Sequence, residues 1–142
     1  MTIEQTLVIF KPDSLERRLV GNILNRFERR GFSISAMKML QLNQEIAKSL
    51  YVSHIDKDFF PELLNFMISQ PIIAVVLSGD NVVINVREML GDTNPLTSLP
   101  NTIRGDYRSA NRPVRENLIH ASDSVESASR EIPIFFNNLE IF

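Results

Sequence analysis

The apolar residues of this chain fall into short continuous runs, separated by longer stretches with a helical period. Most of these runs contain several β-branched or aromatic residues and stop at a proline, a glycine or a polar cluster, which is typical of a buried strand. After the first run, for example, Pro12 has no N–H to donate to a sheet. The pattern predicts strands at residues 6–10, 33–42, 71–77 and 117–120.

Helices are expected between these strands. The first apolar helix face begins at Val20 and ends at Phe27, and Gly31 lies where a helix end favours glycine. Further helices are predicted for residues 44–54, from about Asp58 with Pro61 in the first turn, after Asp80 as N-cap, and after Ser122 or Ser124 as N-cap. The expected inner faces are Val20, Ile23, Leu24 and Phe27; Phe60, Leu63, Leu64 and Met67; Val82, Val83, Val86 and Leu90; and Val125, Ala128 and Ile132.

The predicted elements follow the order strand, helix, strand, two helices, strand, helix, loop, strand, helix. This order favours an α+β sandwich in which helices pack on a small sheet. Residues 91–115 have no sustained apolar period and are interrupted by Pro95, Pro100, Gly105 and Pro113. A loop of this length is uncommon inside a compact domain and tends to be functional.

The composition is that of one domain. The chain has 142 residues, of which 44% are hydrophobic, enough to bury a core. The formal net charge of -2 argues against a general nucleic-acid binder, and the lack of cysteine excludes disulfides and thiolate metal sites. Residues 1–10 lack the basic start of a signal peptide, and no apolar run approaches the roughly 20 residues of a membrane span. A cytoplasmic location without membrane contact is expected.

His120 is one of only two histidines in the chain. It lies at the end of a predicted strand, just before serines and a helix N-terminus that would attract anions. Its position by itself supports a structural histidine and a nucleophile or general base about equally. Glu131 on the last predicted helix could orient the imidazole, which is a recurring arrangement. No P-loop, GxGxxG or HExxH motif is present to suggest another site.

Cationic side chains occur at the ends of predicted elements. Lys11 directly follows the first buried strand, Arg87 precedes the long loop, and Arg104 lies within it. Tyr51 and His54 are three residues apart and therefore share a helix face.

Phe59 and Phe60 are adjacent at a helix start, so both cannot point into the same core. One of the two rings is then available for stacking, although both could also cover core.

Several of these segments resemble the nucleoside diphosphate kinase family. They are TLVIFKPD (6–13), YVSHIDKDFF (51–60), REMLGDTNP (87–95), TIRGDY (102–107) and NLIHASDSVESASREI (117–132), and they occur in the family's order. The resemblance implies one domain over residues 1–142, with a ferredoxin-like α+β sandwich and a four-stranded antiparallel sheet covered by helices. It also implies a transferase that moves the γ-phosphoryl group of a nucleoside triphosphate, mainly ATP, to a nucleoside diphosphate by a ping-pong mechanism through a phosphohistidine.

The resemblance assigns roles to individual residues. His120 matches the phosphorylated histidine, and Glu131, Ser122 and Tyr51 match its supporting partners. The phosphate ligands are matched by Lys11, His54, Arg87, Thr93 and Arg104, the base-stacking aromatic by Phe59, and the sugar contacts by Asn117 and Lys11. The family also implies Mg²⁺ bound through the nucleotide phosphates without protein ligands, and a homo-oligomer built from dimers, either a tetramer or a hexamer.

A histidine suits this chemistry for an energetic reason. The reaction breaks one phosphoanhydride and forms another, so the covalent intermediate should be neither a trap nor a barrier. A phosphohistidine has a comparable transfer potential, whereas a serine phosphate would be too stable. An unperturbed imidazole, with a pKa of about 6.5, also has a free lone pair near neutral pH.

Three departures from the family pattern and two alternative functions remain. Ala121 replaces a common glycine, Lys57-Asp58 replaces a common Arg-Pro, and residues 106–116 are longer and richer in arginine.

A regulatory nucleotide-binding module without turnover is the first alternative function, although His120, Lys11 and Arg104 are all present. A nucleic-acid-binding role is the second, and the acidic balance argues against it.

Overall fold

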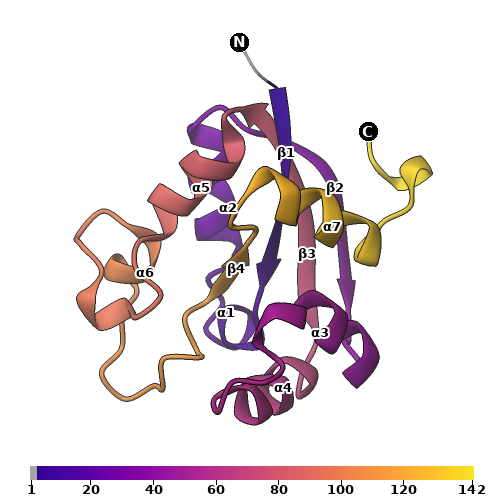
Figure 1. Cartoon of the computed structure of the whole chain (residues 1–142). Coiled ribbons are helices and arrows are strands. Elements are labelled where there is room, and N and C mark those ends of the chain that lie inside the picture. Colours follow the sequence, from indigo (N-terminus) through magenta and orange to yellow (C-terminus); the bar gives the residue numbers. More distant parts are fainter. Residues whose placement is uncertain (1–2) are drawn as a thin grey trace.

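A four-stranded antiparallel sheet lies at the centre of the computed structural model, which describes residues 3–142 (Figure 1). Its order is β2-β3-β1-β4, and each pair of neighbouring strands is antiparallel. The strands are β1 Ile3–Phe10, β2 Ser33–Leu40, β3 Ile72–Asp80 and β4 Ile119–Ala121. The four predicted strands and the ferredoxin-like α+β sandwich are therefore confirmed.

Helices cover both faces of this sheet. Figure 1 shows α2 and α5 on one side, α7 on the other, and α3 with α4 at the end toward which β1 runs. The helices are α1 Pro12–Glu16, α2 Val20–Arg29, α3 Gln44–Leu50, α4 Phe60–Ile68, α5 Val82–Leu90, α6 Ile103–Asp106 and α7 Val125–Phe135. Short 3₁₀ turns occur at Val52–His54, Pro95–Thr97 and Asn138–Glu140.

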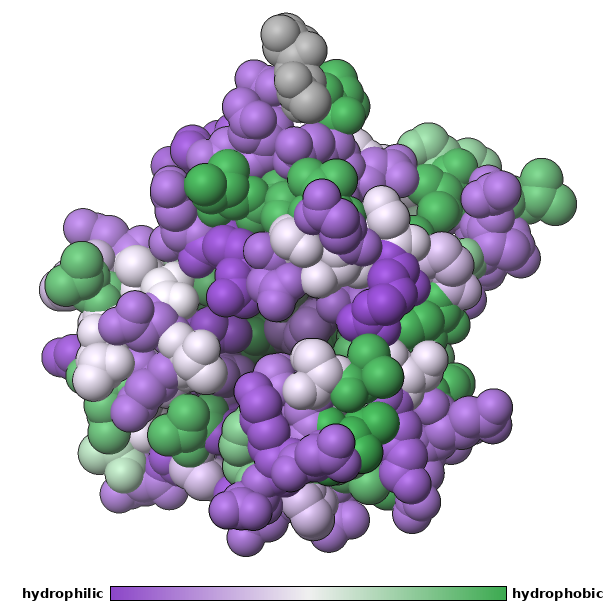
Figure 2. Space-filling model, in the orientation of Figure 1, coloured by the Kyte–Doolittle hydropathy of each residue, from purple (hydrophilic) through white to green (hydrophobic). Residues whose placement is uncertain are grey.

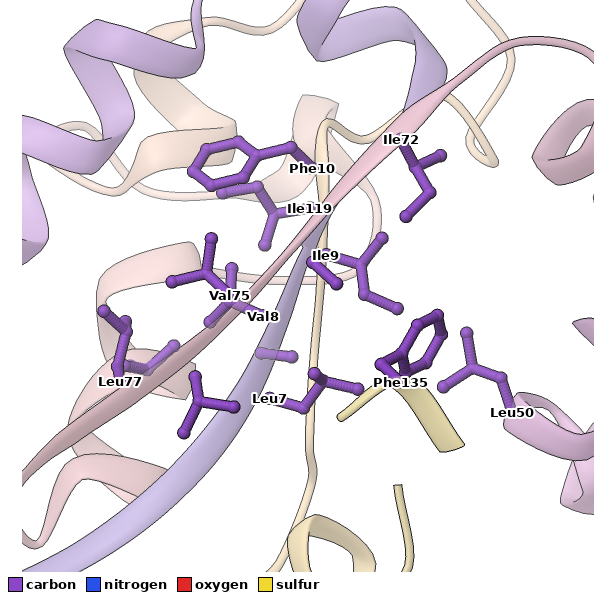
Figure 3. Close-up of a cluster of buried hydrophobic side chains, with 14 of the residues drawn as sticks. Leu7, Val8, Ile9, Phe10, Leu50, Ile72, Val75, Leu77, Ile119 and Phe135 are labelled. Atoms are coloured by element: carbon purple, nitrogen blue, oxygen red, sulfur yellow. The ribbon is translucent and has the colours of Figure 1, made fainter. Parts of the chain in front are cut away.

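The continuous apolar run of β1 reflects its position between two helical layers. Leu7 and Phe10 are fully buried, although the side chains of alternate residues point to opposite faces. Figure 3 shows Leu7 and Ile9 on the side where Leu50 of α3 and Phe135 of α7 pack, and Phe10 on the other side. A strand that is covered on both faces needs apolar residues at every position, which explains why residues 6–10 do not alternate.

The predicted N-cap at Asp80 is wrong. Strand β3 continues through Asp80, because its last residues pair with the start of β1 and place Ile3 opposite Asp80. Helix α5 begins after Asn81, which has a left-handed φ of 50° and makes no side-chain cap hydrogen bond. The polar end of β3 reads as a turn in the sequence, and only its pairing with β1 makes it a strand.

Helix α7 confirms one of its two predicted caps. The Ser124 side chain accepts a hydrogen bond from the Ser127 N–H, whereas the Ser122 hydroxyl donates to Glu131. Val125 was expected on the inner face but is 47% exposed, and the buried face begins one turn later with Ala128.

Four short elements were not predicted. Helix α1, helix α6 and the turns Pro95–Thr97 and Asn138–Glu140 have at most five residues each, too few for a helical period to be visible. The helix expected over residues 44–54 is also divided, since α3 ends at Leu50 and a 3₁₀ turn follows. The long loop thus contains short structured pieces. Among residues 3–142, no helix is both long and apolar enough to cross a membrane.

We expect Arg18→Gly to stabilise the fold. Arg18 is exposed and adopts a φ of 58°, a left-handed conformation that costs most L-residues about 1 kcal/mol or more and glycine very little. After allowance for the larger entropy of the unfolded glycine chain, the gain should be about 0.5 kcal/mol in urea denaturation. Arg29→Gly, at the end of helix α2, is the control and should lower the unfolding free energy. A loss of stability in Arg18→Gly would contradict the expectation.

Candidate functional site

A cavity of about 560 Å³ opens where the ends of β1 and β4 meet the segments that follow α3 and α5. Figure 2 shows a hollow near the middle of this face, surrounded mainly by hydrophilic residues. The structure brings nearly all predicted site residues to its wall: Lys11, Tyr51, His54, Phe59, Arg87, Thr93, Arg104, Asn117, His120 and Glu131. Ser122 is the exception, because it is buried behind Glu131.

His120 is hydrogen-bonded to a carboxylate whose position is fixed by a second hydrogen bond. Its Nε2 lies 2.8 Å from Oε1 of Glu131, and the Ser122 hydroxyl donates to the same oxygen at 2.9 Å. The Glu131 side chain is only 5% exposed, so water competes little for these hydrogen bonds. A neutral imidazole that donates from Nε2 to Glu131 keeps its free lone pair on Nδ1.

The chain reaches His120 through a tight, left-handed turn. Leu118 has a φ of 76°, and the Ile119 N–H donates back to the Asn117 carbonyl at 2.9 Å. The Leu118 N–H donates to Oδ2 of the fully buried Asp13 at 3.0 Å, while the Leu118 carbonyl accepts from the Lys11 N–H. Burial raises the pKa of Asp13, and the Lys11 charge opposes this shift. Lys11 and Asp13, at the start of α1, thus fix the conformation of the residues before His120.

Arg104 secures the same turn from the other side. Its guanidinium donates to the Asn117 carbonyl at 3.1 Å and to the Ile119 carbonyl at 2.6 Å, with longer contacts to Gly91 and Asp92. Burial, together with the positive charge of the nearby Arg87, lowers the pKa of Arg104 to about 10. The residue remains a buried cation at neutral pH, and it faces the cavity next to His120.

Lys11 is an unusual buried amine. Its Nζ donates to Oδ1 of Asn117 at 2.9 Å and to the Arg115 carbonyl at 3.0 Å, while Asn117 donates to the Thr93 carbonyl. Burial, and then the Arg104 charge, lower the pKa of Lys11 to about 7. An anion in the cavity would reverse part of this effect, because it would favour the charged amine.

A row of rings connects the two ends of the cavity. The Tyr51 ring meets His120 edge-on at 5.6 Å, His54 lies 6.0 Å from Tyr51, and Phe59 lies 5.5 Å from His54. Burial, and then the Glu131 charge, raise the pKa of Tyr51, so its hydroxyl stays neutral. Burial, and then the Lys57 charge, lower the pKa of His54.

Phe59 marks the far end of the row. It is 52% exposed while its neighbour Phe60 is buried, so one of the two rings does remain available, as expected. The Arg115 guanidinium, on the arginine-rich stretch 106–116, lies 3.0 Å from the Glu62 carboxylate at this end of the cavity. The stretch is thereby tied to α4.

Several residues of the site are not singled out by the sequence, and Asp13, Val114 and Arg130 are examples. Asp13 marks only a strand stop, although a carboxylate two residues after a buried lysine is a usable signal. Val114 lies in a stretch with no period, and Arg130 looks like a solvated helix charge. The place of Val114 and Arg130 in the cavity depends on contacts between distant segments.

The described residues 3–142 contain no group of three or more His, Cys, Asp or Glu side chains arranged to hold a metal ion. The cations Lys11, Arg87 and Arg104 instead line the cavity near His120. A site with this charge is suited to an anionic ligand with several oxygens, such as a chain of phosphates.

Comparison with known proteins gives consistent matches. The family model described as nucleoside diphosphate kinase matches residues 4–141. A nucleoside diphosphate kinase of Methanocaldococcus jannaschii is 49% identical over 98% of this chain and 97% of its own. One from Thermus thermophilus is 48% identical over 98% of this chain and 99% of its own.

Solved structures agree with these matches. The nucleoside diphosphate kinase of Aquifex aeolicus superposes with a TM-score of 0.93 at 42% identity, over 99% of this chain and 100% of its own. A halophilic nucleoside diphosphate kinase from Halobacterium salinarum, in complex with CDP, has a TM-score of 0.93 at 36% identity, over 99% of this chain and 92% of its own.

The low pKa of Lys11 predicts a specific pH dependence of stability. Between about pH 7 and its ordinary value of 10.5, the unfolded chain holds a proton that the folded chain has lost. Raising the pH in this window therefore favours the folded state, by up to about 1 kcal/mol per pH unit. The unfolding free energy of the wild type should rise relative to that of Lys11→Met, as measured by urea denaturation across this window. Parallel curves for the two proteins would refute the assignment.

Proposed function

This chain belongs to the nucleoside diphosphate kinase family, enzymes that transfer phosphoryl groups between nucleotides, and we propose that it does so through a phosphohistidine on His120. In this proposal, the γ-phosphoryl group of a nucleoside triphosphate, mainly ATP, passes to His120 and then to a nucleoside diphosphate. The single domain of residues 1–142 carries the whole reaction.

The Glu131–His120 hydrogen bond is the observation that carries the proposal. It engages Nε2 at 2.8 Å and leaves the lone pair on Nδ1, inside a cavity rich in cations. Ser122 fixes the carboxylate and the Tyr51 ring supports one edge of the imidazole. A nucleophile gains most when its ring is held in line with the group it attacks.

The transfer takes place in two matching steps. In the first, Nδ1 of His120 attacks the γ-phosphorus, an N–P bond forms, and the electron pair of the broken P–O bond goes to the departing diphosphate. The Nε2 proton stays in its hydrogen bond to Glu131, so no proton leaves the ring. In the second step, a terminal oxygen of another nucleoside diphosphate attacks the same phosphorus and releases Nδ1.

The cations stabilise the charge that spreads over the phosphoryl oxygens in each step. Arg104 and Arg87 approach from α6 and α5, and Lys11 from the end of β1. Thr93 and His54 complete the phosphate contacts. Because Lys11 is near its titration midpoint at neutral pH, phosphate binding should draw a proton onto it.

The base and sugar contacts follow from the row of rings. The exposed Phe59 is the last ring of the row that starts at His120, and it offers a face on which any base can stack. Asn117 and Lys11 are placed to contact the sugar hydroxyls. Stacking does not read the base edge, so low base specificity is expected.

Mg²⁺ fits this site as a partner of the nucleotide phosphates. The cavity wall next to His120 offers Lys11, Arg87 and Arg104 rather than a carboxylate cage, and Glu131 is already engaged by the imidazole. When bound, the ion would neutralise phosphate charge that the protein cations leave uncompensated.

We also propose a homo-oligomer built from dimers, a tetramer or a hexamer, located in the cytoplasm and binding neither membrane nor nucleic acid. Strand β2 lies at an edge of the sheet and leaves Met37 and Met39 46% and 62% exposed. The C-terminal Phe142, 94% exposed, hydrogen-bonds to Ser35 of the same strand. Apolar residues along an edge strand favour contact with a second copy.

Radiolabelling tests the proposed intermediate. Wild type incubated with γ-labelled ATP and Mg²⁺ should acquire acid-labile, alkali-stable label, which added GDP should remove as labelled GTP. His120→Ala should acquire none, because the nucleophilic ring is gone. His54→Ala, which removes the other histidine, should still be labelled. Absence of label on the wild type despite measurable ATP binding would reject the enzyme in favour of a nucleotide-binding module.

Light scattering on the purified protein tests the assembly. The mass should correspond to four or six chains, and Met39→Asp should give smaller species, because a charge on an edge strand opposes association. Lys57→Asp, far from β2 in the sequence, serves as a charge control and should keep the wild-type mass. A monomeric wild type would contradict the proposal.

A further inference from the structure

Arg130 connects the two elements that hold His120. Its Nη1 donates to the Ser49 carbonyl at 2.8 Å, and its Nη2 donates to the Leu50 carbonyl at 3.3 Å. These are the last two residues of α3, and carbonyls at a helix end have no partner within the helix. A cation there also interacts favourably with the helix dipole.

The same guanidinium reaches the carboxylate behind His120. Nη2 of Arg130 lies 3.3 Å from Oε2 of Glu131, whereas Oε1 is occupied by His120 and Ser122. Among the described residues, Glu131 has two ion-pair partners: the His120 imidazole and the Arg130 guanidinium. Arg130 is therefore placed to compensate part of the Glu131 charge that faces His120.

We propose that Arg130 is a positioning residue that tunes the nucleophile through Glu131, an inference that rests on the phosphohistidine function proposed above. With the guanidinium in place, Glu131 orients the imidazole without an excess of negative charge. Without it, the unscreened carboxylate favours the protonated imidazolium, which has no lone pair for attack. Loss of Arg130 should thus reduce phosphorylation at low pH and spare it at high pH.

Other charges near His120 cannot replace this effect. The titratable and charged groups that line the cavity from the surrounding elements are Lys11, Tyr51, His54, Glu62, Arg87, Arg104, Arg115, Asp123, Arg130 and Glu131. Arg104 is engaged with backbone carbonyls of the turn before His120, and Arg87 approaches the Ala121 carbonyl. In the proposed reaction these two cations also contact phosphate, whereas Arg130 touches Glu131 directly.

The position of Arg130 also ties Tyr51 to the nucleophile. Tyr51 follows Leu50 at the end of α3, and its ring meets His120 edge-on at 5.6 Å. If Arg130 only held Tyr51 in place, its loss would lower the phosphorylation rate equally at every pH. The pH dependence of phosphorylation separates the two roles.

The test is the rate of phosphorylation by ATP and Mg²⁺, measured in a single turnover between pH 5.5 and 9.5. In Arg130→Met, the acidic limb of the profile should move to higher pH by about 0.5 to 1 unit, the size expected for one partly solvated charge. The rate at pH 6 should then fall by about 3- to 10-fold, with little change above pH 8.5. Arg130→Lys, which keeps the charge, should move the limb by less than half as much. Arg29→Met, which removes an exposed arginine of α2, should leave the profile unchanged.

Repeating the Arg130 substitution in Glu131→Gln tests whether its effect depends on the Glu131 carboxylate. In Glu131→Gln there is no carboxylate charge to screen, so adding Arg130→Met should not move the acidic limb. An unchanged profile in Arg130→Met, or an equal loss of rate at every pH, would overturn the inference while wild-type labelling leaves the proposed function intact. A wild type that is never phosphorylated would instead overturn the proposed function. Thermal unfolding of each variant shows whether it is folded. If Arg130→Met is not, Arg130→Gln, which also removes the charge, takes its place with the same expected shift.

Discussion

The left-handed turn at Leu118 is the constraint on which the site depends. It turns the chain into a strand of only three residues, β4, in a place where its backbone N–H and carbonyl groups cannot reach water. Asp13 accepts from the Leu118 N–H, and Arg104 donates to the carbonyls on either side. Since an unpaired buried polar group costs about 1–3 kcal/mol, the turn and these side chains hold each other in place. The orientation of His120 follows from that mutual dependence.

The groups that complete the turn also provide the electrostatics of the cavity. Lys11 and Arg104 are held by neutral oxygens rather than by carboxylates, so burial lowers the pKa of both. Such cations interact more favourably with an anionic ligand than they do with the empty cavity. In the proposed function, phosphate in the cavity offsets the unfavourable burial of these two charges.

Helix α7 packs on the face of the sheet opposite α2 and α5, and it carries two further residues around His120 (Figure 1). Adjacent residues on this helix have complementary tasks, because Glu131 reaches His120 while Arg130 reaches the end of α3. Two elements distant in sequence are thereby joined around one imidazole. The proposed mechanism depends on this connection because Tyr51, at the end of α3, also meets the His120 ring edge-on.

The sequence by itself determined the strands, the main helices and most of the polar residues that line the cavity. Local chemistry sufficed for these: the uninterrupted run 6–10 indicated a buried strand, and the adjacent Phe59 and Phe60 indicated that one ring could remain free of the core. The tertiary structure decided features that arise from pairing between distant segments. Asp80 belongs to a strand because β1 lies beside it, and Arg130 belongs to the site because α3 ends where α7 passes. In each case a polar group forms its hydrogen bond with a partner many residues away. The local pattern of hydrophobic and polar positions holds no information about such a partner.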